Sequence, residues 1–161
     1  MPIIPGQSLD HLRAIVQAFG ASAGLPFLQL DDQGSTAVRL GSGGRLELEY
    51  AASSDRLFAY VEVLVAPPQE SLQWAAIARQ SVQLMSNYGF SLGLGEVEGS
   101  DRLLAMASLP AANLSEDTLG DSLLELVAAA GAVGDRLREL PHEPATTGDT
   151  GTTADLQVIR V

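Results

Sequence analysis

Residues 90–110 read FSLGLGEVEGSDRLLAMASLP, and their interpretation determines the class of fold. A glycine-rich run of this kind can cradle a phosphate where a strand leads into a helix. Here Glu96 and Glu98 lie inside the run and would repel phosphate, and the strand-like segment RLLAMASLP follows instead of a helix. The pattern therefore predicts a β-hairpin with strands at 90–97 and 102–109.

A helix is expected on each side of this hairpin. Between about residues 70 and 88, apolar side chains recur at helical spacing on more than one face. Such a helix usually contacts more than one neighbour, and the second neighbour could be a sister subunit. After the hairpin, Ser115 is a typical N-cap, Glu116 and Asp117 suit a first helical turn, and apolar spacing extends this helix to about Leu140.

The preceding part of the chain predicts one more helix and a set of strands. Ser8 is interpreted as the N-cap of a helix that ends near Phe19. From Phe27 to Val65 the apolar period drops to two, and turn-forming residues interrupt it three times, which predicts antiparallel strands. The last of these strands, 57–65, is apolar on both faces. Either both of its faces are covered, or one face awaits a partner.

The composition indicates one folded domain with an acidic surface. The chain has 161 residues, and we expect a single domain at 1–140 followed by a flexible Thr/Gly/Pro-rich tail at 141–161. The longest apolar runs are too short to be inserted across a membrane. Twenty acidic side chains oppose nine basic ones, and the net charge of -11 argues against nucleic acid as a partner. A cationic or apolar polypeptide fits this surface better.

The residues predict no catalytic, cofactor or metal site. Cysteine is absent, and the two histidines have no spacing that suggests a metal site. Carboxylate pairs occur at Asp31 and Asp32, at Glu47 and Glu49, and at Glu96 and Glu98. Such pairs are most often a turn or the solvated side of a sheet. They leave open the alternative of a small enzyme that uses an unseen metal.

The order helix, strands, helix, two strands, helix on a short acidic chain resembles the class I type III secretion chaperones of the Tir chaperone (CesT) family. The resemblance is carried by residues 72–140, where LQWAAIARQSVQLMSNYG leads into the hairpin and the helix SEDTLGDSLLELVAAA follows it. It implies an α+β fold of helix, three strands, helix, two strands and helix, in which a twisted antiparallel sheet packs with the helices.

The resemblance also implies a function. Members of this family are bacterial cytoplasmic homodimers that bind the N-terminal region of secreted effector proteins. They hold that region extended and deliver it to the secretion apparatus without hydrolysing nucleotide themselves. Contacts with the secretion ATPase or with sorting components are implied as well. A regulator of the same fold that binds another secretion component is an alternative.

Two groups of site residues follow from the resemblance. The middle helix would form the dimer interface through Leu72, Trp74, Ile77, Ala78, Ser81 and Met85. Apolar side chains on the early strands and beside them would receive the effector, namely Leu28, Leu30, Val38, Leu40, Phe58 and Tyr60.

Overall fold

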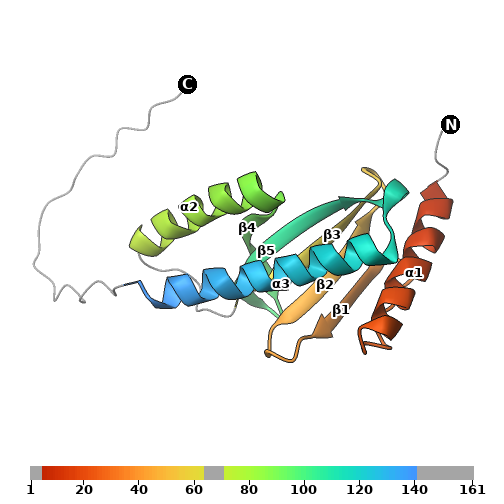
Figure 1. The fold of residues 1–161 in the computed structure, drawn as a ribbon, viewed down its shortest axis with the longest axis horizontal. Helices are drawn as coiled ribbons and strands as arrows, with labels where there is room; N and C mark the ends of the chain where they lie inside the picture. The colour runs from red at the N-terminus through yellow and green to blue at the C-terminus, as the bar shows by residue number, and fades with distance from the viewer. Residues whose placement is uncertain (1–4, 64–70, 141–161) are drawn as a thin grey trace, which may run out of the picture.

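The computed structural model describes residues 5–63 and 71–140, and it has the α+β order that the sequence predicts (Figure 1). Outside the described residues lie the end of the predicted strand 57–65 and the predicted tail at 141–161. The elements are α1 (Pro5–Ser22), β1 (Ser35–Arg39), β2 (Arg45–Ala51), β3 (Arg56–Glu62), α2 (Ser71–Tyr88), β4 (Ser91–Val97), β5 (Ser100–Pro110), the 3-10 turn η1 (Ala111–Asn113) and α3 (Glu116–Arg138).

The five strands form one antiparallel sheet in the order β1-β2-β3-β5-β4. Helix α3 lies along the central strands β3 and β5, α1 packs beside α3, and α2 packs along β4 (Figure 1). We call the side that carries α3 the inner face of the sheet and the opposite side the outer face. Of the described helices, α3 packs on the central strands from the inner face, and the outward side chains of these strands are only partly buried (Figure 1).

The core lies between the inner face and the helices. Strict alternation along the strands directs one set of side chains inward. On α3 the buried side chains recur at helical spacing, with Val127 half-buried at the border. The buried residues of the sheet and of α3 are Leu46, Leu48, Tyr50, Leu57, Ala59, Val61, Leu103, Ala105, Ala107, Leu119, Leu123, Leu126, Ala130, Val133, Gly134 and Leu137.

The predicted hairpin is confirmed, with a tighter turn than expected. Val97 pairs with Ser100, so the turn consists of Glu98 and Gly99, both at positive φ (51° and 76°). Two left-handed residues give the turn whose twist matches that of the flanking strands. The cap of α3 is also confirmed, because the Ser115 hydroxyl accepts a hydrogen bond from the Thr118 amide at 3.2 Å.

The glycines of β4 make room for side chains of β5. A Cβ atom on Gly95 would lie 2.5 Å from Cδ1 of Leu104, and one on Gly93 would lie 3.0 Å from Cε of Met106. Both side chains therefore fold over the bare backbone of β4. This contact, and not phosphate binding, explains the glycine pattern of the segment.

The prediction that Ser8 caps the first helix is wrong. The helix begins at Pro5, which suits a first helical turn because its fixed φ is already helical and its missing N–H has no intrahelical partner there. Ser8 is buried one turn further on, and its hydroxyl hydrogen-bonds to the phenol of Tyr50. The Tyr50 hydroxyl in turn donates to Asp55 at 2.9 Å. The short polar side chain therefore serves the core, not the helix end.

The expectation of a strand over residues 27–30 is also wrong. The chain there is a loop that returns from α1, and the next strand begins only at Ser35. Asp31 closes the turn between them, because its Oδ1 accepts from the amides of Gln33 and Ser35 at 2.9 Å each. Arg13 of α1 anchors this turn by donating to the Asp31 carbonyl at 2.8 Å.

The contact between α1 and its following loop should be sensitive to one methyl group. An alanine at Gly20 would place its Cβ 2.7 Å from the Leu25 carbonyl oxygen and 3.0 Å from the Leu28 Cβ, so backbone would have to move. We expect Gly20→Ala to lower the free energy of unfolding by about 1–3 kcal/mol in urea unfolding. Gly131 of α3 has open space around it, and Gly131→Ala should raise that free energy by up to about 1 kcal/mol. Changes of the same sign would contradict this account.

Candidate functional site

Helix α2 keeps most of its large apolar side chains on the surface of the subunit. Only Ile77 and Leu84 are buried. The others are between 43% and 67% exposed, and we call them the α2 surface: Leu72, Trp74, Val82, Met85 and Tyr88. The folded chain therefore buries only one side of this helix, although the helix is apolar on more than one side.

The predicted interface residues divide between this surface and the subunit core. Leu72, Trp74, Ala78 and Met85 are exposed, as a contact with another molecule requires. Ile77 packs in the core, so its side chain stabilises the subunit itself. The Ser81 hydroxyl is half-buried and accepts a hydrogen bond from the Leu92 amide of β4 at 3.3 Å, which fastens α2 to the sheet.

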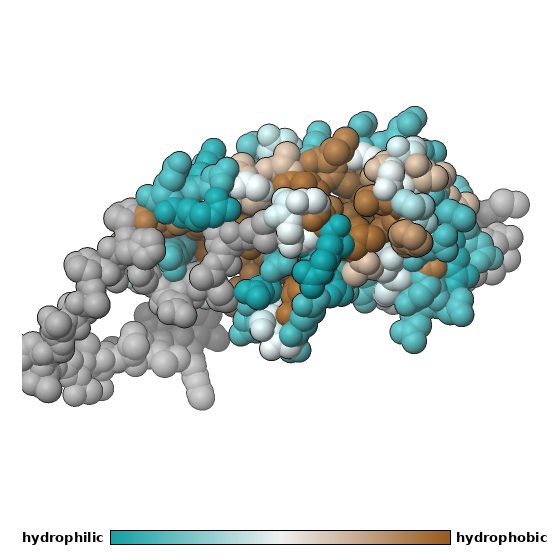
Figure 2. All heavy atoms as spheres, turned by 90° about the horizontal axis from the view of Figure 1, so that it is seen from below, coloured by the Kyte–Doolittle hydropathy of each residue, from teal (hydrophilic) through white to brown (hydrophobic). Residues whose placement is uncertain are grey.

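Strand β4 continues the α2 surface. Among the described strands β4 pairs only with β5, so it forms one edge of the sheet beside α2 (Figure 1). Leu94 of this strand is half exposed, and the ring of Tyr88 stacks on that of Phe90 with centroids 5.8 Å apart. Figure 2 views the molecule from below, on the side away from α2, and shows that apolar side chains also gather across the middle of this face, between hydrophilic regions. The core thus leaves apolar surface uncovered.

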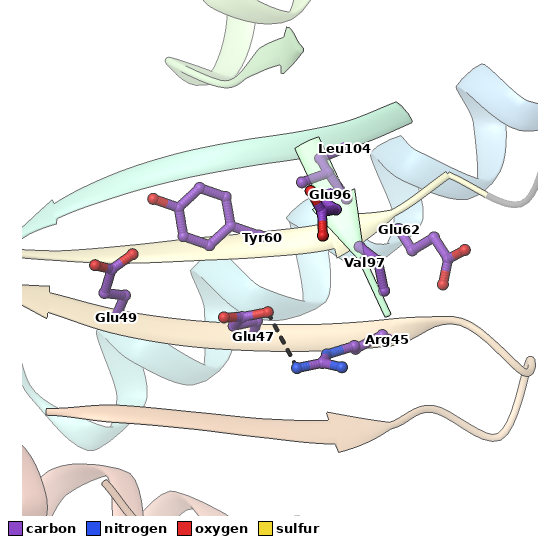
Figure 3. A pocket seen from close by; sticks show the side chains of 8 residues that line it. All are labelled: Arg45, Glu47, Glu49, Tyr60, Glu62, Glu96, Val97 and Leu104. Atoms are coloured by element: carbon purple, nitrogen blue, oxygen red, sulfur yellow. Dashed lines mark ion pairs between the residues drawn. The ribbon is translucent and has the colours of Figure 1, made fainter. Parts of the chain in front are cut away.

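The outer face of the sheet holds a second surface, which contains a hollow of about 170 Å³. Figure 3 looks onto this face, with α3 behind the strands. Four strands supply the residues that line the hollow: Arg45, Glu47 and Glu49 of β2, Tyr60 and Glu62 of β3, Glu96 and Val97 of β4, and Leu104 of β5. Four glutamates and one arginine make its lining negative.

The sheet curls around this hollow, because its two ends meet on the outer face. Glu98, in the turn between β4 and β5, accepts from Arg39 of β1 at 2.9 Å and lies 3.7 Å from a guanidinium nitrogen of Arg45. These ion pairs join the first and last strands of the sheet at one end. The pair of Arg39 and Glu98 is largely exposed and contributes little stability on its own, but together the two pairs close one end of the hollow.

The charges in the hollow act on Tyr60. Burial raises the pKa of its phenol above 10.0, and the nearby negative charge of Glu49, which also hydrogen-bonds to Tyr60, raises that pKa further. Two of the glutamates have cationic partners: Glu47 lies 3.4 Å from Arg45, and Glu62 lies 3.3 Å from Arg102. Glu49 and Glu96 have no cationic partner among the residues that the structure describes.

The six residues predicted to receive an effector fall in three places. Leu28 and Leu30 are buried in the core, at 1% and 6% exposure, because the loop after α1 turns them inward. Val38 and Leu40 are half-buried at the end of β1, with Val38 opposite the buried Leu46 and hence on the inner face. The register puts Phe58 and Tyr60 on the outer face instead, with their rings stacked at 6.4 Å.

Two further residues of the outer face are Leu104 and Met106, which pair across the sheet with Glu62 and Tyr60. Sequence reasoning did not select them. The signal was present, because alternation along RLLAMASLP puts Leu104 and Met106 opposite in direction to the small residues Ala105 and Ala107.

Comparison with known proteins assigns the fold to a family. A model of the Tir chaperone protein (CesT) family matches residues 14–133. The chain belongs to this family. No match was found among curated proteins.

Three solved complexes contain chains similar in fold to this CesT-family chain. A chain of the ExsC–ExsE complex has a TM-score of 0.68 and 19% identity, over 80% of this chain and 95% of that one. A chain of the HopA1–SchA chaperone–effector complex has a TM-score of 0.67 and 21% identity, over 83% of this chain and 99% of that one. A chain of the ExoT–SpcS complex from Pseudomonas aeruginosa has a TM-score of 0.53 and 21% identity, over 74% of this chain and 94% of that one.

The described residues of this CesT-family chain give the metal-enzyme alternative no support. No group of three or more potential ligands among them is arranged to hold a metal ion. Asp31 closes a turn, and Asp32 pairs with Arg13 at 2.9 Å. Within the same residues, no helix combines the length and hydrophobicity needed to cross a bilayer.

The influence of Glu49 on Tyr60 can be measured directly. We expect Glu49→Gln to lower the pKa of Tyr60, because the negative charge that opposes ionisation of the phenol is removed. The pKa should remain above 10.0, since burial is the larger cause. An NMR titration of chain labelled with ¹³C at tyrosine Cζ would follow Tyr60. An unchanged pKa would show that the two side chains do not interact in solution.

Proposed function

We propose that this CesT-family chain is a homodimeric type III secretion chaperone of the bacterial cytoplasm. It binds the N-terminal chaperone-binding region of one or more effector proteins, keeps that region extended, and delivers it to the secretion apparatus. The observation that carries the proposal is that two separate apolar surfaces remain after the core of the subunit is complete. Membership of the CesT family supports it, and so does the likeness to a chain of a chaperone–effector complex.

The α2 surface suits contact with a second copy of the chain. Trp74 and Met85 project from one side of α2 at 43% and 54% exposure, beside the free edge of β4. The helix contains no acidic residue. Two copies that meet there bury apolar area without bringing carboxylates of α2 together, which favours a symmetric dimer.

The free edge of β1 and the outer face suit an extended client. An extended peptide can add main-chain hydrogen bonds at an exposed strand edge while its alternate side chains fill apolar pockets. Val38 and Leu40 lie at the β1 edge, and Phe58 and Tyr60 lie on the outer face. The client takes the place of the solvent that now meets these side chains.

We assign no catalytic step to the chain. Its action consists of binding, and delivery takes place through contacts with the secretion ATPase or with sorting components. A regulator of the same fold would use the same surfaces but would bind a secretion component that is not exported. The identity of the captured polypeptide distinguishes these two functions.

Substitutions on the α2 surface should separate dimerisation from folding. We expect Trp74→Asp and Met85→Asp to give a folded monomer, because both side chains are exposed on the subunit but would bury an unpaired charge in a dimer. Light scattering after size exclusion gives the mass, and far-UV circular dichroism reports folding. Leu124→Asp, on the exposed side of α3, is the matched control and should remain dimeric. A dimer in all three variants would rule out this interface.

Substitutions at the proposed client surface should weaken capture without unfolding the chain. We expect Phe58→Asp and Leu40→Asp to lower recovery of the client about tenfold while the dimer persists. The tagged chain is recovered from its native cell, and bound polypeptides are identified by mass spectrometry. Leu124→Asp again serves as control.

The same experiment tests the proposed function. We expect the captured polypeptide to be exported, and its export to fail in cells that lack this chain. A captured component that is never exported would assign the chain to regulation. Normal capture by both Phe58→Asp and Leu40→Asp would remove the proposed client surface.

A further inference from the structure

The hollow on the outer face combines an apolar floor with a rim of carboxylates. Leu104, Val97 and the ring of Tyr60 supply the apolar contacts, and the glutamates surround them (Figure 3). A side chain with a long aliphatic stem and a cationic end matches this arrangement, because it can bury the stem while its charge reaches the rim. Arginine and lysine are the two natural side chains of this kind.

The size of the hollow favours a side chain over a free small molecule. Its volume of about 170 Å³ is smaller than the roughly 300–1,000 Å³ of sites that enclose small-molecule ligands. The hollow also opens on a sheet face whose neighbouring side chains, Phe58 and Met106, are apolar and half-buried. A polypeptide that crosses this face can fill the hollow and cover those neighbours together.

The charge balance of the hollow favours a cation as the occupant. Arg45 and Arg102 already neutralise Glu47 and Glu62. Glu49 and Glu96, which both line the hollow, lack such a partner within the described part of the chain. An incoming guanidinium or ammonium group would therefore be attracted to the carboxylates of this rim, whereas an anionic or acidic segment would be repelled.

We propose that this hollow receives an arginine or lysine side chain from an extended segment of the bound client. The proposal rests on the proposed function, since the client supplies the segment. In an extended chain, residues two apart point to the same side at about 7 Å spacing. An apolar residue two positions from the cation therefore packs on Phe58, which lies two residues from Tyr60 along β3. The client motif is a basic residue flanked by apolar residues at alternate positions.

A peptide titration of the full chain, followed by ¹⁵N NMR, tests this assignment. The probe is the acetylated and amidated peptide Leu-Ser-Arg-Ser-Leu, and its matched control carries citrulline, which keeps the shape of arginine without the charge. We expect shifts at Glu49, Tyr60 and Leu104, and about fivefold weaker binding of the citrulline peptide. No shift at these residues, or equal affinity for the two peptides, would overturn the proposal.

Variants of the chain separate local charge from total charge. We expect the double variant Glu49→Gln and Glu96→Gln to bind the arginine peptide about fivefold more weakly than the wild type does. Asp121→Asn combined with Glu125→Gln removes the same charge from the exposed side of α3 and should leave the affinity unchanged. If both double variants lost the same affinity for the arginine peptide, the effect would come from the net charge of the chain, and the proposed cation site would be wrong.

The other possible occupants are distinguished by the same spectra. Shifts in the hollow on deletion of residues 141–161 would assign it to the chain's own C-terminal segment, and shifts on dilution would assign it to a second copy. Either result overturns the proposal. If the wild type and the double variant Glu49→Gln and Glu96→Gln captured the client equally well, the proposed cation site would be wrong, but the proposed function would stand. A peptide bound in the hollow of a chain that captures no exported protein overturns the proposed function instead.

Discussion

The packing of α3 on the centre of the sheet is the contact on which the rest of the structure depends. Ala59, Ala105 and Ala107 are buried at the centre of the inner face, and Ala59 and Ala107 are direct partners in the sheet. Small side chains there let the leucines of α3 approach the strands closely. Helix α3 occupies the centre of this face with α1 beside it, and α2 lies at the edge beside β4 and buries only Ile77 and Leu84.

The same alternation that builds the core also builds the outer face. Every inward alanine of β5 has an outward neighbour, and Leu104 and Met106 fold over the glycines of β4. The tight turn at Glu98 and Gly99 increases the twist of this hairpin, and Glu98 then reaches the arginines of the first two strands. The hairpin of β4 and β5 thus supplies Glu96, Val97 and Leu104 to the hollow, and β2 and β3 supply the rest of its lining.

Local patterns in the sequence predicted the elements well, but not their relation in space. Ser115 with its two acidic neighbours marks a helix start by chemistry confined to one turn, and the structure confirms it. Ser8 carries the same local signal, yet its hydroxyl is engaged by Tyr50, more than forty residues away in sequence. Leu28 and Leu30 alternate as strand residues do, but the loop between α1 and β1 buries both. The hollow depends on ion pairs between residues of different strands, and no local pattern encodes such pairs.

Under the proposed function, the distribution of charge favours different partners for the two apolar surfaces. A chain with a net charge of -11 repels its own copies, so self-association is least costly where carboxylates are absent. Helix α2 has no acidic residue, whereas the outer face is bordered by four glutamates. A second copy placed on the outer face would bring these glutamates close to like charges, which costs free energy and disfavours that contact. Under the proposed function, the acidic rim disfavours a second copy on the outer face and favours a partner of opposite charge there, while α2 is the surface proposed for contact between two copies.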